Sequence, residues 1–166
     1  MPDMESARQL RFRPATAPDA AFLRTLHDRN RPEFAALPDP ERQALLAWQY
    51  QARSASYAER YPEATSWLIV VEHDPIGALM VNASRQQVDL IDLALLPEWQ
   101  GQGLGKATLA RLQACAHPRS ITLHVWPQTP AQRLYENAGF QIVGQKGPYV
   151  AMRWSLKADG FPVAEF

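Results

Sequence analysis

The sequence has few of the features that mark secreted, membrane-bound or nucleic-acid-binding proteins. Its 166 residues include one cysteine, Cys115, which excludes an intramolecular disulfide and is typical of a reducing compartment. Seventeen basic and seventeen acidic residues cancel, so no overall field attracts nucleic acid or anionic lipid. The N-terminus lacks the apolar core of a signal peptide, and the longest strictly aliphatic or aromatic run spans only residues 67–71. We therefore expect a soluble cytoplasmic protein that binds neither nucleic acid nor membrane.

Metal ligands and domain boundaries are also lacking. The four histidines, His27, His73, His117 and His124, show no metal-ligand spacing, so no metal site is predicted. No repeat, low-complexity segment or linker divides the chain. A chain of this length buries roughly 70% of its unfolded surface in one core, so residues 1–166 are expected to form a single domain.

Hydrophobic periodicity predicts an α/β fold in which helices flank a mixed sheet, in the order β-α-α-β-β-β-α-β-α-β-β. One helix is expected to begin at Asp39, as N-cap before Pro40, and another at Thr129, with Gly139 at its end. Cys115 falls on the apolar face of the helix that begins at Leu104, which predicts a packed thiol. Strands are expected at 10–13, 67–72, 76–82, 88–95, 121–125, 140–143 and 149–154, and helices at 19–28, 39–60, 104–116 and 129–137.

The connection between strand 88–95 and helix 104–116 is rich in glycine. It contains Gly101, Gly103 and Gly105, three of the eight glycines of the chain. A strand, a glycine turn and a helix start gather unpaired N–H groups at the positive end of the helix dipole, which predicts an anion site. Lys106 supports this interpretation, because a cation in the first turn opposes the dipole unless an anion shares it. The plainer alternative is a tight connection with an exposed lysine.

The phosphate ligand can be narrowed by comparing motifs. The P-loop pattern fails at Gln100 and Ala107, and the dinucleotide pattern G-x-G-x-x-G fails at its third glycine. The segment instead resembles the acetyl-CoA loop of the general N-acetyltransferase (GNAT) superfamily, R/Q-x-x-G-x-G/A, matched here by Gln100, Gly103 and Gly105. The preceding residues, 95–100, are similar to the family's V-x-P-E-x-R, and residues 134–140, LYENAGF, resemble its L-Y-E-K-x-G-F signature.

This resemblance implies a GNAT-like fold, a mostly antiparallel sheet with one splayed parallel strand pair and about four helices. Residues 67–154 would bind the cosubstrate acetyl-CoA, 1–66 would supply the acceptor side, and 155–166 would be a tail. The opened strand edge would pair with pantetheine, and an N–H near Leu95 would donate to the thioester carbonyl. Thr129 stands where relatives usually place an asparagine. The implied cofactor-binding residues are Leu93, Ala94, Leu95, Leu96, Gln100, Gly101, Gln102, Gly103, Leu104, Gly105, Lys106, Thr129 and Tyr135.

The implied reaction is direct transfer of an acetyl group to a primary amine in a ternary complex. Deprotonating a lysine-like amine at neutral pH costs about 4.6 kcal/mol, so a base or a water relay is expected. Asp89 occupies the position of a glutamate base in some relatives, and Asp92 is the nearby alternative. Tyr135 of the LYE motif is expected to protonate the departing thiolate.

The acceptor is not predicted beyond an amine on a small molecule or peptide. Its pocket is expected to use Arg31, Phe34, Trp48, Tyr57 and Tyr149, which lie in the first helices and the closing hairpin. The protein is expected to be a monomer or a homodimer. The alternative function is a non-catalytic acyl-CoA-binding sensor or interaction module.

Overall fold

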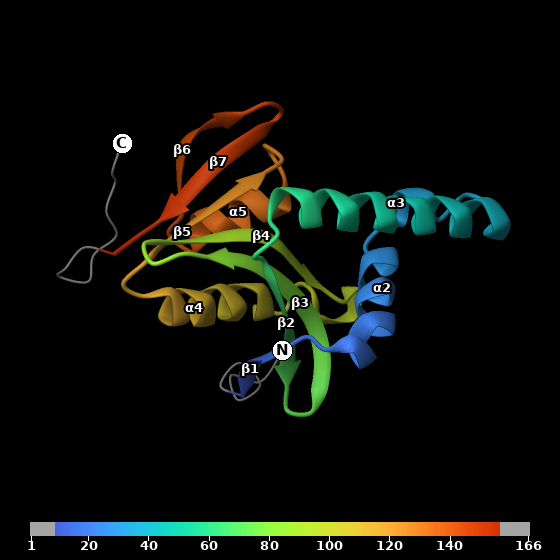
Figure 1. The fold of residues 1–166 in the computed structure, drawn as a ribbon, viewed down its shortest axis with the longest axis horizontal. Coiled ribbons are helices and arrows are strands. Elements are labelled where there is room, and N and C mark those ends of the chain that lie inside the picture. The colour runs from blue at the N-terminus through green and yellow to red at the C-terminus, as the bar shows by residue number, and fades with distance from the viewer. Residues whose placement is uncertain (1–8, 157–166) are drawn as a thin grey trace.

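The computed structural model describes residues 9–156, which form one seven-stranded sheet with helices on both faces (Figure 1). The element order agrees with the predicted one. The strands are β1 (Leu10–Pro14), β2 (Thr65–Val71), β3 (Asp74–Ala83), β4 (Gln87–Leu95), β5 (Ser120–Val125), β6 (Gln141–Lys146) and β7 (Tyr149–Trp154). The α-helices are α2 (Ala20–Arg29), α3 (Asp39–Arg60), α4 (Leu104–Ala116) and α5 (Pro130–Asn137), with 3-10 turns η1 (Ala17–Asp19), η2 (Pro32–Phe34) and η3 (Pro97–Trp99).

The sheet has the order β1-β2-β3-β4-β5-β7-β6, and every neighbouring pair except β4–β5 is antiparallel. The parallel pair has only three rungs, which join residues 87–89 to residues 120–122. Past Asp89 and Thr122 both strands continue, β4 along β3 and β5 along β7, without facing each other as a ladder. The predicted splayed pair is confirmed, and from Leu90 onward β4 has a neighbouring strand on one side only.

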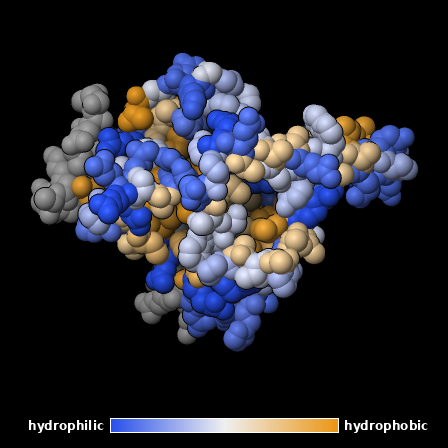
Figure 2. Space-filling view, in the orientation of Figure 1, coloured by the Kyte–Doolittle hydropathy of each residue, from blue (hydrophilic) through white to orange (hydrophobic). Residues whose placement is uncertain are grey.

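The two faces of the sheet carry different helices. The larger core cluster joins α4 and α5 to one face, through side chains such as Leu109 and Tyr135. The smaller cluster joins α2 to the other face, where Leu26 packs on Leu68 and Ala78. The 22-residue helix α3 has one buried residue, Leu46, and extends well beyond the rest of the molecule in Figures 1 and 2.

Helix ends follow the predicted chemistry in α5 and depart from it in α3. Thr129 caps α5 by accepting the N–H of Gln132, and Gly139, at φ 93°, ends the helix as predicted. The prediction of Asp39 as a cap is wrong, because Pro38 is the cap and Asp39 the first helical residue. The acidic side chain still lies at the positive end of the helix dipole.

The prediction of a packed Cys115 is also wrong, because this residue is exposed. The buried stripe of α4 turns around the helix, from Leu104 and Thr108 at its start to Leu112 and Ala116 at its end. At 100° per residue, Cys115 lies near the margin of the last part of this stripe.

Candidate active site

The glycine-rich connection forms a cradle of backbone N–H groups, defined here as the amides of residues 101–106. No hydrogen-bond acceptor in the described residues serves any of these amides, and the first N–H of α4 with a partner is that of Ala107, which donates to the Gly103 carbonyl. The first turn of α4 contains no acidic residue. Six unpaired donors at a helix N-terminus are a suitable site for an anion.

The three glycines of the cradle serve different purposes. Gly101 and Gly103 have φ of 71° and 80°, which L side chains rarely adopt, and a Cβ at either would meet nothing within 4 Å. A Cβ on Gly105 would instead lie 3.1 Å from Cδ2 of Leu134, so this glycine lets α4 pack against α5. Leu104 points into the core, which leaves only its backbone for a ligand.

Side chains of the connection bind back to the protein rather than point into the cradle. Gln100 donates to Oδ1 of Asn30 and to the Leu95 carbonyl, both at 2.9 Å, and Gln102 donates to the Glu98 carbonyl. Asn30 also donates to the Leu95 carbonyl at 3.1 Å, so the end of α2 is joined to the end of β4. Lys106 is exposed and forms no ion pair within residues 9–156.

Two backbone groups at the end of β4 have partners within the protein. The Leu96 N–H donates to the Ile76 carbonyl at 2.8 Å. The Leu95 carbonyl accepts two side-chain bonds, from Asn30 and Gln100. These two backbone groups are therefore not free to pair with an added strand, because other parts of the chain already satisfy them.

Tyr135 lies in α5 beneath the edge of the sheet and is 9% exposed. Its ring packs edge-on against Phe140 at 5.6 Å between centroids, and its hydroxyl forms no hydrogen bond with the described residues. Burial, with a smaller contribution from the Asp92 carboxylate, raises the pKa of this hydroxyl above its usual range. The phenol therefore holds its proton at neutral pH, and because its hydroxyl has no partner in the described residues, that proton is available to a ligand.

Both hydrogen bonds of the Thr129 hydroxyl stabilise the start of α5. Its hydroxyl donates to the Trp126 carbonyl at 2.8 Å and accepts the N–H of Gln132 at 3.3 Å. The preceding Gln128 has φ 59° and donates its N–H to the Gln132 side chain. The amide function expected here in relatives thus has no equivalent in the Thr129 side chain.

A first cavity of about 430 Å³ lies between α2, α3 and the centre of the sheet. It contains two of the predicted acceptor residues, Arg31 and Tyr57, together with Asp92, the alternative base. It is lined by Leu23, Leu26, His27, Asn30, Arg31, Tyr50, Arg53, Ser54, Tyr57, Ala58, Tyr61, Pro62, Ala64, Ser66, Ala78, Leu79, Met80, Asp92 and Ala94.

A second cavity of about 650 Å³ lies over the gap between β4 and β5 and shares Tyr57 and Tyr61 with the first. The predicted residues Asp89 and Tyr149 line it. His124 also lines it, and burial together with nearby Lys146 lowers the pKa of this imidazole, which is neutral at pH 7.

The two candidate bases have different surroundings. Asp89 sits on the last rung of the parallel pair, where Oδ1 accepts from Thr122 Oγ1 and from Gln87 Nε2, each at 2.5 Å. Asp92 lies on the open part of β4 and forms an ion pair with Arg53 of α3. Asp92 and Tyr135 interact electrostatically across this part of the strand. The open edge therefore has a carboxylate on the α3 side and a phenol on the α5 side.

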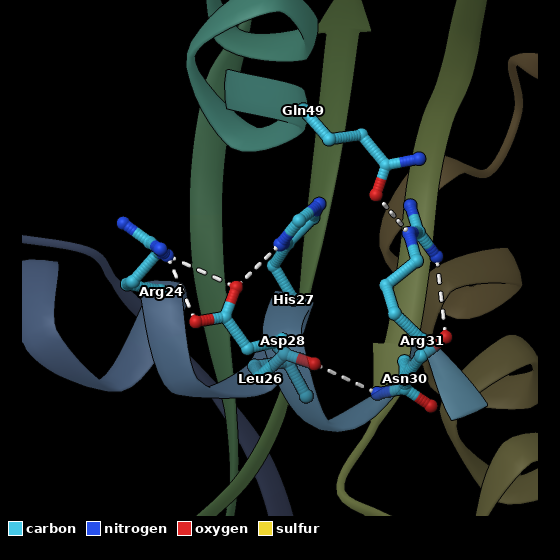
Figure 3. Close-up of polar contacts among 7 residues, drawn as sticks. All are labelled: Arg24, Leu26, His27, Asp28, Asn30, Arg31 and Gln49. Carbon is cyan, nitrogen blue, oxygen red and sulfur yellow. Dashed lines mark hydrogen bonds and ion pairs between the residues drawn. The ribbon is translucent and has the colours of Figure 1, made fainter. Parts of the chain in front are cut away.

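Sequence analysis assigned no function to two residues that line the first cavity, His27 and Arg53. Figure 3 shows His27 beside Asp28. The His27 side chain is 1% exposed, its Nδ1 lies 2.8 Å from Asp28, and its buried Nε2 has no hydrogen-bond partner in the described part of the chain. Burial, followed by the nearby guanidinium groups of Arg31 and Arg53, lowers its pKa despite Asp28. Arg53, which holds Asp92, is spaced four residues before Tyr57 on α3, so helical spacing was the available signal.

Phe34 and Trp48 are not brought to either cavity. Trp48 is 67% exposed and lies on a side of α3 that lines neither cavity. The 3.6-residue period of α3 puts Tyr50, Arg53 and Tyr57 toward the cavity instead.

Two further findings limit the chemistry of residues 9–156. No group of three or more His, Cys, Asp or Glu side chains there could hold a metal ion. No helix in the same range is both long enough and apolar enough to span a bilayer.

Comparison with known proteins agrees with this geometry. Residues 62–142 match the model of the acetyltransferase (GNAT) domain. The ribosomal protein bS18-alanine N-acetyltransferase of Haemophilus influenzae is 27% identical over 121 residues, 70% of this chain and 81% of that protein. The PaiA N-acetyltransferase of Thermoplasma acidophilum, solved with coenzyme A, superposes with a TM-score of 0.65 at 15% identity, over 87% of this chain and 97% of that one. The spermidine N-acetyltransferase of Vibrio cholerae, solved with coenzyme A and spermine, gives 0.58 at 18% identity, over 88% and 94%.

Proposed function

We propose that this protein, in which residues 62–142 match the GNAT acetyltransferase domain, transfers an acetyl group from acetyl-CoA directly to a primary amine. The observation that carries this proposal is the cradle of unpaired amides at residues 101–106, next to a strand edge that β5 leaves open. The cradle suits a diphosphate and the edge suits an amide-containing arm, the two features that coenzyme A combines.

The protein contributes to the reaction by binding acetyl-CoA and by orienting its thioester toward the amine. Acetyl-CoA supplies the activated thioester: a bond forms from the amine nitrogen to the carbonyl carbon, the bond from that carbon to sulfur breaks, and the sulfur leaves as a thiol. Gly101 to Lys106 hold the diphosphate, and the edge from Leu93 to Leu95 aligns the thioester, with an N–H near Leu95 toward its oxygen. Binding energy far from the reacting atoms thus fixes the geometry of attack.

Asp92 is the base that the surroundings support. It lies on the open part of β4, lines the first cavity, and is reached by an amine entering between α2 and α3. Asp89 is committed to Thr122 and Gln87 at the closed end of the strand pair. Asp92 would accept the proton that the amine loses, directly or through water, while Arg53 keeps the carboxylate in place.

Tyr135 is the proposed acid, on the opposite face of the same edge. Its hydroxyl carries its proton at neutral pH and forms no hydrogen bond with the described residues, so it is free to donate. Protonation of the leaving thiolate by Tyr135 completes the transfer.

The proposal is tested by isothermal titration of coenzyme A, followed by thiol release from acetyl-CoA with a panel of primary amines. We expect saturable binding and amine-dependent release that Tyr135→Phe strongly reduces. Saturable binding without release for any amine would favour a non-catalytic sensor. Absence of binding would refute the proposal.

A further inference from the structure

We infer that the acceptor is a small amine that carries a carboxylate, and that Arg31 is the residue that recognises it. This inference rests on the proposed function and specifies its acceptor. The contact it predicts is between the carboxylate and the free side of the Arg31 guanidinium in the first cavity.

The charged groups around the first cavity are unbalanced. Its lining contains two guanidinium groups, Arg31 and Arg53, and a single carboxylate, Asp92. Asp92 is paired with Arg53, which leaves the charge of Arg31 without an opposite charge in the lining. A cavity with this surplus disfavours a polycation and favours an acceptor that brings its own negative charge.

Arg31 is held in place by neutral partners. Its Nε donates to Oε1 of Gln49 at 2.9 Å, and one terminal nitrogen donates to the Asn30 carbonyl at 3.2 Å (Figure 3). No ion pair of Arg31 occurs among residues 9–156, and its other terminal nitrogen has no protein acceptor there. A guanidinium fixed on one side and free on the other can bind a carboxylate without paying for its own ordering.

The unmatched charge of Arg31 also acts on its neighbours in the cavity. It contributes to lowering the pKa of His27 and opposes the rise in the pKa of Tyr57, so its field reaches both sides of the cavity. Neutral His27 adds no second positive charge. Tyr50, Tyr57 and Tyr61 provide the apolar walls, and Asp92 lies in the same cavity, so one acceptor can extend from the guanidinium to the base.

The test compares amino acids with their own amides, which differ only in the charge that Arg31 would bind. Thiol release from acetyl-CoA is measured with phenylalanine, leucine and alanine, with the three matching amides, and with spermidine. The quantity of interest is the ratio of kcat/KM for acid over amide in the wild type, divided by that ratio in Arg31→Gln. This double ratio cancels differences in amine basicity.

We expect the double ratio to be about 10 to 100, the contribution of one charge-assisted hydrogen bond, and to arise in KM for the acid. Arg31→Lys should restore part of it, and Arg11→Gln, which removes a guanidinium on β1, should leave it unchanged. A double ratio near one, or faster turnover of amides and spermidine that Arg31→Gln does not alter, would overturn the inference while leaving the acetyltransferase intact. If coenzyme A does not bind at all, the proposed function itself fails.

Discussion

Substitution of Gly103 by alanine tests the cradle most directly. This glycine is at φ 80°, and the added Cβ would meet no atom within 4 Å, so its effect on the free protein is conformational only. An L residue in this region costs about 1 kcal/mol relative to glycine, which lowers the melting temperature of a chain of this size by about 2–4 °C. Gly147, at φ 57° with equally open surroundings, gives a matched control outside the cradle.

Coenzyme A binding should separate the two variants. A Cβ at the surface of the cradle, or a loop that relaxes away from φ 80°, removes at least one amide-to-phosphate bond. Such a bond is worth about 1.5–3 kcal/mol, so we expect about 10- to 100-fold weaker binding. At 100 times the wild-type Kd, the ligand stabilises the wild type by about 2.7 kcal/mol, and a variant weakened about 30-fold by only about 0.9 kcal/mol.

Differential scanning fluorimetry with and without coenzyme A measures both the melting temperature of each free variant and its increase on ligand binding. Gly147→Ala should lower the melting temperature by the same 2–4 °C as Gly103→Ala, because both substitutions cost about 1 kcal/mol. Coenzyme A should still raise the melting temperature of Gly147→Ala as much as it raises that of the wild type. The reasoning is refuted if Gly103→Ala retains the wild-type upshift, or if both variants lose it equally.

Three further predictions concern the proposed catalytic residues and the buried His27. Tyr135→Phe should lower kcat by about 100-fold or more while changing the unfolding free energy by less than about 0.5 kcal/mol, because the hydroxyl has no protein partner in the described residues; a stopped-flow thiol assay and urea unfolding measure the two. Asp92→Asn should reduce kcat/KM by about 100-fold with Asp89→Asn changing it little, and the reverse order in steady-state assays would assign the base to Asp89. Burial lowers the pKa of His27, so this imidazole binds a proton more readily in the unfolded chain than in the folded one, and the stability that it contributes above about pH 6.5 is lost as the pH falls through its lower folded pKa. His27→Gln should therefore flatten the dependence of the unfolding free energy on pH in that window. An unchanged slope would contradict a buried neutral imidazole.

The sequence predicts the fold well where local chemistry decides it. Alternation and turns place the strands, and the cap at Thr129 with the left-handed Gly139 bounds α5 as predicted. The cradle also follows from local signals, since glycine positions and a helix start are enough to predict unpaired amides. These features depend on neighbours within a few residues along the chain.

The acceptor side could not be predicted in the same way, because it depends on contacts between distant residues. Periodicity identifies two faces of α3 but not which one meets the sheet, so Trp48 is exposed while Arg53 reaches Asp92, 39 positions away. The same limit applies to His27, whose burial depends on where α3 crosses α2. The Leu95 carbonyl is a third case, since nothing in the strand pattern indicates that Asn30 and Gln100 will bind it.

The hydrogen bonds from Asn30 and Gln100 to the Leu95 carbonyl stabilise the end of β4 next to its open edge. A strand that separates from its neighbour leaves polar groups exposed, and buried ones without partners are costly. Here the protein satisfies the carbonyl at the end of β4 with two side chains, one from α2 beside the first cavity and one from the connection that forms the cradle. The same hydrogen bonds therefore fix the end of α2, the edge of β4 and the start of the cradle relative to one another. Among residues 9–156, the amides of the cradle and, past Asp89, the edge of β4 that faces away from β3 stay unpaired, and these are the groups that a diphosphate and a pantetheine arm would take.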